Sequence, residues 1–233
     1  MMPMATALKL GRVSNLPTVW TNVLAGVALA ALEPTWPSVI PVAVAASLLY
    51  VAGMYLNDAF DRGWDAQHRP ERPIPAGEVD ARTVFLAGFA LMTAALVLLL
   101  VTTNTRAFVA GLGLAGLILV YDITHKKTRL APLVMGLCRM AVYLVAACAA
   151  APHVAPPVYA GATFLFFYLV MLSTIAREET TNPKLRRLVA RLIAGISLVD
   201  GAQLLVIGHA WPALACLGAF VLTLALQKRV AGT

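Results

Sequence analysis

The feature that most restricts the fold of this chain is a succession of about eight apolar stretches, each close to the roughly 20 residues that a helix needs to cross a bilayer. They cover residues 14–32, 38–57, 82–102, 107–122, 132–151, 155–176, 186–208 and 211–228. Only 12% of the residues are charged, against ~25% in a typical soluble domain. The sequence therefore predicts an all-α polytopic membrane protein with a single domain over residues 1–233.

The distribution of basic residues predicts the orientation of these spans. The formal net charge of +7 comes from Lys and Arg in short loops between apolar stretches, which favours membrane topology over nucleic-acid binding. Apart from Arg106 and Arg139, all of them lie at the two ends of the chain or on one set of alternate connections. Because Lys and Arg accumulate in cytoplasmic loops, we expect both termini and the long loops 58–81 and 177–185 in the cytoplasm, with the spans in the cell inner membrane.

Cysteines and histidines do not indicate a disulfide or zinc site. Cys138, Cys148 and Cys216 lie within apolar spans and lack CxxC spacing, so we interpret them as small core residues. The four histidines are scattered without metal-ligand spacing. The first apolar stretch lacks a small-residue cleavage site, and we expect a full span there rather than a signal peptide.

An acidic cluster follows the second apolar stretch, in the segment NDAFDRGWD. Asp58, Asp61 and Asp65 have the i, i+3, i+7 spacing of one helix face, with Asn57 beside them. Carboxylates next to hydrocarbon are costly, and three on one face repel each other unless a cation lies among them. Oxygen ligands suit Mg²⁺, which proteins usually bind through a few carboxylates together with substrate phosphates. We therefore expect these three aspartates to be metal ligands.

The residues after this cluster predict a phosphate-binding loop. Arg72 is followed by Pro73 and Pro75, which restrict the backbone, and by Gly77, which permits a turn. A rigid cationic loop beside a carboxylate face is what a magnesium-bound diphosphate requires. The alternative is an interfacial loop whose charges only set topology, but this does not explain four spaced Asn and Asp residues.

The pattern N-D-x-x-D-x-x-x-D, followed by R-P and a glycine, resembles the first signature of the UbiA superfamily of intramembrane prenyltransferases. The segment 17–26 is similar to the first helix of that family, where Asn22 matches an asparagine that faces the cavity. Tyr121 with the segment 125–128 is similar to the stretch after the fourth helix. Gly136–Arg139 resembles a G-x-x-R element of a UbiA-like subgroup that includes proteins called EboC.

The resemblance implies helices around a central cavity, with Mg²⁺ and a prenyl diphosphate donor at its cytoplasmic mouth. It implies transfer of the prenyl group to an aromatic, lipid-like or other small acceptor, within the lipid bilayer. The residues expected to be catalytic are Asp58, Asp61 and Tyr121. Those expected to bind substrate are Asn22, Asn57, Arg72, Lys126, Arg139 and Glu178.

The chain departs from the family pattern in three places. The second aspartate-rich signature is replaced by a segment with Glu178 and Glu179, of which we expect Glu178 to contribute more to donor binding. Asp122 follows Tyr121 where proline is usual, and the family commonly has nine helices rather than eight.

Several alternatives stay open from the sequence. Arg139 is interpreted as a phosphate ligand, but it can also pair with Asp122 or extend toward the cytoplasmic face. Lys126 can contact phosphate or anionic lipid. Asp200 can pair with Gln203 or line a polar crevice. At the level of function, the rivals are a small metabolite transporter and a non-catalytic UbiA-like binding or scaffold protein.

Overall fold

The structure is a computed structural model that describes residues 2–31, 36–176, 183–230 and 232. In these residues the secondary structure is entirely helical, which confirms the predicted fold class. The helices are α1 (Met4–Leu10), η1 (Val13–Asn15), α2 (Leu16–Ala30), α3 (Trp36–Phe60), α4 (Arg62–His68), α5 (Ala81–Thr102), α6 (Thr105–Thr124), α7 (Ala131–Ala150), α8 (Pro156–Ala176), α9 (Pro183–Val206) and α10 (Ala210–Gln227).

Seven helices of the described chain, α3 and α5 to α10, are long and apolar enough to cross a membrane. The first predicted span is shorter than expected. Its first residues belong to the short helix η1, and the helix that follows, α2, has only 15 residues. At 1.5 Å per residue α2 extends about 22 Å, less than the ~30 Å thickness of the hydrocarbon layer. The expected count of about eight spans is therefore one higher than the number of full-length apolar helices described.

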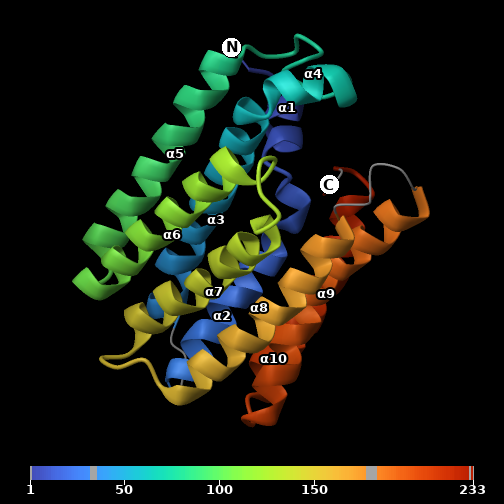
Figure 1. Cartoon of the computed structure of the whole chain (residues 1–233). Helices are drawn as coiled ribbons and strands as arrows, with labels where there is room; N and C mark the ends of the chain where they lie inside the picture. The colour runs from blue at the N-terminus through green and yellow to red at the C-terminus, as the bar shows by residue number, and fades with distance from the viewer. Residues whose placement is uncertain (1, 32–35, 177–182, 231, 233) are drawn as a thin grey trace.

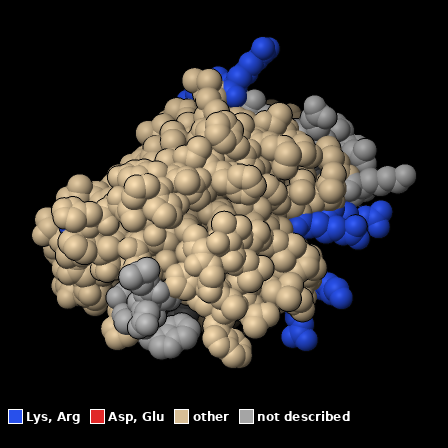
Figure 2. All heavy atoms as spheres, turned by 90° about the horizontal axis from the view of Figure 1, so that it is seen from below, with Lys and Arg blue, Asp and Glu red and all other residues tan. Residues whose placement is uncertain are grey.

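The long helices run up and down in one bundle, and the polar connections gather at one end of it. Figure 1 shows α1, α4, the α6–α7 connection and the C-terminal end of the chain at this common end. The opposite end carries the α5–α6, α7–α8 and α9–α10 connections. Viewed from that side, the surface is almost wholly uncharged, with Lys and Arg projecting only at its margins (Figure 2).

The short helix α2 lies at the centre and contacts α3, α7, α8, α9 and α10. It separates two hydrophobic clusters, one built mainly from α3, α5, α6 and α7 and the other from α7, α8, α9 and α10. Its close approach to α7 depends on Gly26, where a Cβ atom would lie 2.8 Å from the carbonyl oxygen of Tyr143. These contacts place α2 where its polar side chains reach both halves of the bundle.

Local sequence signals determine how the helices end. Asp80 caps the first turn of α5 by accepting hydrogen bonds from the backbone N–H groups of Arg82 and Thr83, at 2.8 and 3.0 Å. The end of α3 is different, because backbone hydrogen bonds from Asp61 to Asn57 and from Asp65 to Asp61 continue the helical pattern into α4. The acidic motif therefore stays on nearly helical backbone at the polar end of the bundle.

Candidate active site at the mouth of a central cavity

A cavity of about 600 Å³ opens among α2, α3, α6, α7, α8 and α9. Its charged and polar lining comes mainly from the acidic motif, the loop after α4 and the α6–α7 connection. Apart from Arg139, its interior is mainly apolar, and the lining there includes Val19, Leu49, Leu114, Ile118, Val142, Leu169, Leu172, Val189, Ile193 and Ile196. One end of this cavity can hold a charged group while the rest holds a hydrocarbon chain.

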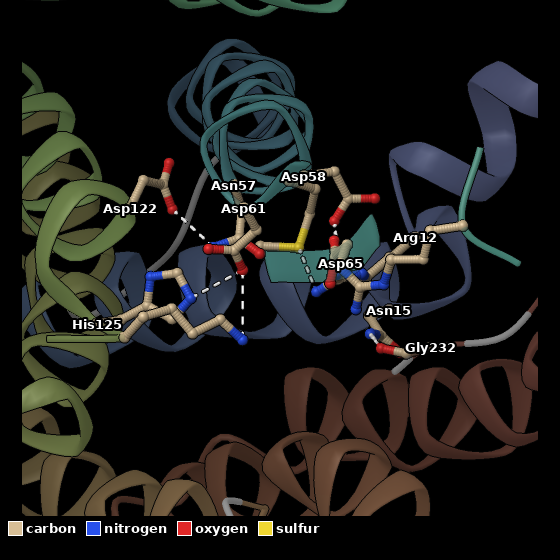
Figure 3. Close-up of polar contacts among 12 residues, drawn as sticks. Arg12, Asn15, Asn57, Asp58, Asp61, Asp65, Asp122, His125 and Gly232 are labelled. Atoms are coloured by element: carbon tan, nitrogen blue, oxygen red, sulfur yellow. Dashed lines mark hydrogen bonds and ion pairs between the residues drawn. The ribbon is translucent and has the colours of Figure 1, made fainter. Parts of the chain in front are cut away.

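The first polar cluster at the mouth joins two of the predicted aspartates through arginines (Figure 3). The guanidinium of Arg72 lies 2.8 Å from Asp58 Oδ1 and 3.1 Å from Asp65 Oδ2. Arg12, from the connection between α1 and η1, donates a second hydrogen bond to Asp58 Oδ1 at 2.9 Å. Burial raises the pKa of Asp65 above its usual range, and the charge of Arg72 only partly opposes this rise. Asp58 and Asp65 thus share Arg72, whereas Asp61, which the spacing predicts on the same helix face, contacts other basic residues.

Asp61 belongs to a second cluster, formed with the α6–α7 connection. Its Oδ2 lies 3.0 Å from His125 Nε2 and 3.4 Å from Lys126 Nζ. Burial alone would raise the pKa of Asp61, but the hydrogen bonds and charges of His125 and Lys126 outweigh it and keep this pKa below its usual range. The same Lys126 Nζ lies 3.8 Å from the centre of the Trp64 ring, in a cation–π contact.

The remaining candidates at the mouth are Asn57, Asp122 and Tyr121. The side-chain amide of Asn57 donates to Asp122 Oδ1 at 3.2 Å. Tyr121 lines the cavity, and its ring stacks on that of His125 with 4.9 Å between the ring centres. Asp122, which replaces the usual proline, thus adds a fourth buried carboxylate beside the predicted three.

The oxygen atoms at the mouth fit a magnesium ion in chemical type. Asp65 Oδ1 and Asp122 Oδ2 are buried and have no hydrogen-bond partner among the described residues. However, within the described part of the chain no three His, Cys, Asp or Glu side chains converge as a preformed metal site. The charge repulsion that suggested a metal is already offset by Arg12, Arg72 and Lys126. A bound cation therefore requires these basic side chains to exchange partners.

One substrate-binding expectation is corrected deeper in the bundle. Asn22 does not face the cavity, because it is completely buried between Arg139 and Asp200 and hydrogen bonds to both. Arg139 lines the cavity, where a substrate-binding residue is expected, and its role stays a prediction. The alternative pair with Asp122 is not formed, because Arg139 donates to Asn22 and Thr18. Glu178 and Glu179 lie outside the described residues.

The sequence did not identify Arg12 as a candidate. Its backbone is left-handed, with φ of 42° and ψ of 46°, a conformation that non-glycine residues rarely adopt. This geometry directs a residue from before the first long helix into the mouth, where it contacts Asp58 and Met54. Its position shortly before the segment 17–26 was the only available signal, since neither the turn nor the partner is encoded in a local pattern.

The helical fold and the cavity together define an integral membrane protein whose cavity has a charged mouth and a mainly apolar interior. The matching family model is described as the UbiA prenyltransferase family and covers residues 19–232. The chain therefore belongs to the UbiA prenyltransferase family.

Individual relatives and solved structures agree with this assignment. A 4-hydroxybenzoate octaprenyltransferase from Idiomarina loihiensis is 31% identical over 123 residues, which are 52% of this chain and 42% of that protein. A digeranylgeranylglyceryl phosphate synthase from Natronomonas pharaonis is 29% identical over 143 residues, 61% of this chain and 50% of the relative. The matched region thus spans half or less of each of these proteins.

A UbiA homologue from Archaeoglobus fulgidus, solved with DMAPP and Mg²⁺, aligns with a TM-score of 0.65 over 97% of this chain and 88% of its own. The sequence identity of that alignment is 15%, so it establishes the fold alone. The same homologue bound to GPP and Mg²⁺ gives a TM-score of 0.64 at 15% identity, over 97% of this chain and 89% of its own.

Proposed function

We propose that this protein transfers a prenyl group from a magnesium-bound prenyl diphosphate to a small acceptor inside the cavity. The observation that carries the proposal is the division of one cavity of about 600 Å³ into a charged mouth and an apolar interior. Membership of the UbiA family supports it, as do relatives named for prenyl transfer and neighbours solved with DMAPP or GPP and Mg²⁺.

In this proposal the mouth residues bind the diphosphate. Asp58, Asp61 and Asp65 hold Mg²⁺, which neutralises part of the diphosphate charge and makes it a better leaving group. Arg72, Arg12 and Lys126 move from carboxylates to phosphate oxygens, since a guanidinium or ammonium group suits either anion.

The interior residues protect the reacting carbon. The bond between the allylic carbon and the diphosphate oxygen breaks with its electron pair remaining on oxygen. The acceptor then forms a bond to this carbon and loses a proton. Apolar walls exclude water from the allylic cation, and the ring of Tyr121, which lines the cavity near the mouth, can stabilise it through its π-face.

A direct assay tests this function. The purified protein in lipid nanodiscs is incubated with geranyl diphosphate, Mg²⁺ and a panel of aromatic and glycerophosphate acceptors, and products are detected by mass spectrometry. We expect a product ~136 mass units heavier than one of the acceptors, because a geranyl group replaces a hydrogen atom. This product should not form when EDTA removes the metal. Donor binding without any product from any acceptor contradicts the enzymatic proposal.

One observation favours a second candidate, a non-catalytic binding protein. Asp58, Asp61 and Asp65 already have basic partners, so the charges of the proposed metal ligands are offset without a metal. In that case prenyl diphosphate binds with an affinity independent of Mg²⁺. The same nanodisc preparation distinguishes the two by measuring donor affinity with and without the metal.

We also propose that the mouth faces the cytoplasm and that both termini lie on that side, in the inner membrane. The positive residues at this end support the orientation. The spatial proximity of the two chain ends supports an arrangement with both on one side, since Asn15 Nδ2 donates to the carbonyl oxygen of Gly232 at 2.8 Å.

A further inference from the structure

Arg139 forms a polar centre in the cavity that is distinct from the charged mouth. It lies eight residues into α7, about 12 Å along the helix axis from Ala131, and lines the cavity. One guanidinium nitrogen donates to Asn22 Oδ1 at 2.8 Å and the other terminal nitrogen to Thr18 Oγ1 at 3.2 Å. Among the described residues no carboxylate lies within ion-pair distance of this guanidinium, in contrast to Arg12 and Arg72.

A chain of buried hydrogen bonds, here called the relay, connects Arg139 through Asn22 to Asp200 and Tyr143. The amide of Asn22 accepts from Arg139 and donates from its Nδ2 to Asp200 Oδ2 at 2.8 Å. The second oxygen of Asp200 accepts from the hydroxyl of Tyr143 at 2.5 Å. Asn22, Tyr143 and Asp200 are all completely buried. The carboxylate that balances the charge of Arg139 is therefore one side chain removed from it.

Asn22 acts as a spacer between Arg139 and Asp200, so that no carboxylate occupies the guanidinium group directly. A carboxylate placed directly on Arg139 would take two guanidinium N–H groups in a bidentate pair. Asn22 uses only one, and Thr18 a second, out of the five N–H groups that an arginine carries. The other three N–H groups have no hydrogen-bond partner among the described residues, and the side chain lines the cavity, with the ring of Tyr50 5.6 Å from the guanidinium carbon.

We propose that Arg139 binds an oxyanion of the acceptor, a carboxylate or a phosphate monoester, and that Asn22 is a positioning residue that keeps the other N–H groups of Arg139 available. That the bound oxyanion belongs to the acceptor rests on the proposed function, whereas the presence of an oxyanion site at Arg139 does not. The donor diphosphate has Arg12, Arg72 and Lys126 at the mouth, so a separate cation deeper in the cavity suits a second, smaller anion.

Three variants of the relay and one of Arg139 test this inference. Asn22→Asp places a carboxylate directly on Arg139. The double variant Asn22→Asp with Asp200→Asn keeps the composition and net charge of the natural protein but moves the carboxylate one side chain forward. Asp200→Asn alone leaves the spacer in place and removes the distant negative charge. Arg139→Gln removes the cation itself.

Binding is measured by calorimetry in nanodiscs with benzoate, with its neutral counterpart benzamide, and with glycerol 1-phosphate. Preference for benzoate or for glycerol 1-phosphate tells which oxyanion the site takes. A separate titration uses geranyl S-thiolodiphosphate with Mg²⁺ as a donor probe, so that loss of the oxyanion site and failure of donor binding are distinguished.

We expect Asn22→Asp, the double variant and Arg139→Gln to lose at least tenfold in affinity for the preferred oxyanion, with benzamide and donor affinity within about threefold of the natural protein. Asp200→Asn should bind the oxyanion at least as well as the natural protein, which also shows that the relay can be altered without unfolding. Wild-type oxyanion affinity in the double variant, or equal loss of donor affinity, overturns the proposal. If the Asn22 variants do not fold, unchanged oxyanion affinity in Arg139→Gln also overturns it.

Discussion

At the scale of single residues, the acidic motif is distributed over two clusters. Asp58 and Asp65 share Arg72, whereas Asp61 contacts the α6–α7 connection through His125 and Lys126. This division arises because positions three residues apart on a helix differ in direction by about 60° and so face different neighbours. Each aspartate therefore has a separate set of basic groups that it can exchange for a metal and phosphate.

We predict that Asp58→Asn and Asp61→Asn each lower the magnesium-dependent affinity for geranyl S-thiolodiphosphate at least tenfold. Each substitution removes a charge that the proposed cation requires but nearly keeps the side-chain shape. Asp80→Asn is the matched control, since Asp80 is an exposed cap of α5 outside the cavity and asparagine also caps helices well. The measurement is calorimetry across a magnesium series. Wild-type affinity in both motif variants contradicts the assignment of the metal ligands.

At the scale of secondary-structure elements, the short helix α2 determines how the two halves of the bundle pack together. Its two sides pack against different hydrophobic clusters, and its polar residues enter the relay to α7 and α9. The contact with α7 is possible only because Gly26 has no side chain to clash with Tyr143 and Ala146.

We predict that Gly26→Ala destabilises the protein by about 1–3 kcal/mol, the usual cost of forcing an extra methyl group into a packed core. The added Cβ would lie 2.8 Å from both the Tyr143 carbonyl oxygen and Ala146 Cβ. Gly113→Ala is the control, because nothing lies within 4 Å of a Cβ built there. It should be neutral or slightly stabilising through alanine's higher helix propensity. Thermal unfolding in detergent measures both, and equal stability of the two variants would refute the packing argument.

The N-terminus of α5 should be pH-sensitive. Hydrogen bonds from the Thr83 hydroxyl and from the backbone N–H groups of Arg82 and Thr83 lower the pKa of Asp80 below its ordinary value. The stabilisation is therefore present above the unfolded-state pKa of about 3.9 and is lost as the pH falls through the lower folded-state pKa. We expect hydrogen-exchange protection of the first turn of α5 to decrease at low pH in the natural protein relative to Asp80→Asn. A constant ratio between the two proteins from pH 6 to pH 2.5 would contradict this.

At the scale of the whole molecule, both chain ends and the charged connections lie at one end of the bundle (Figure 1). We predict that a cysteine introduced at His68 reacts with a membrane-impermeant reagent only from the cytoplasmic side, and one at His153 only from the other. Both positions are exposed and belong to opposite ends of the bundle. Cys138, Cys148 and Cys216 must first be replaced to give a cysteine-free background. Labelling of residue 68 from the outside refutes the orientation.

The sequence by itself was sufficient for the helical membrane class, the approximate spans, the acidic motif and the family, because hydrophobic length and motif spacing are local properties of the chain. The EboC-like subgroup and the roles of Glu178 and Glu179 stay predictions.

Only the tertiary structure decided which groups meet. Arg12 reaches Asp58 across 46 residues of sequence, and Asn22 reaches Asp200 across 178. Such partners depend on how the helices pack and where a left-handed turn directs a side chain, and no local pattern specifies either. For the same reason the sequence placed Asn22 on the cavity wall, whereas packing of α2 against α7 and α9 buries it behind Arg139.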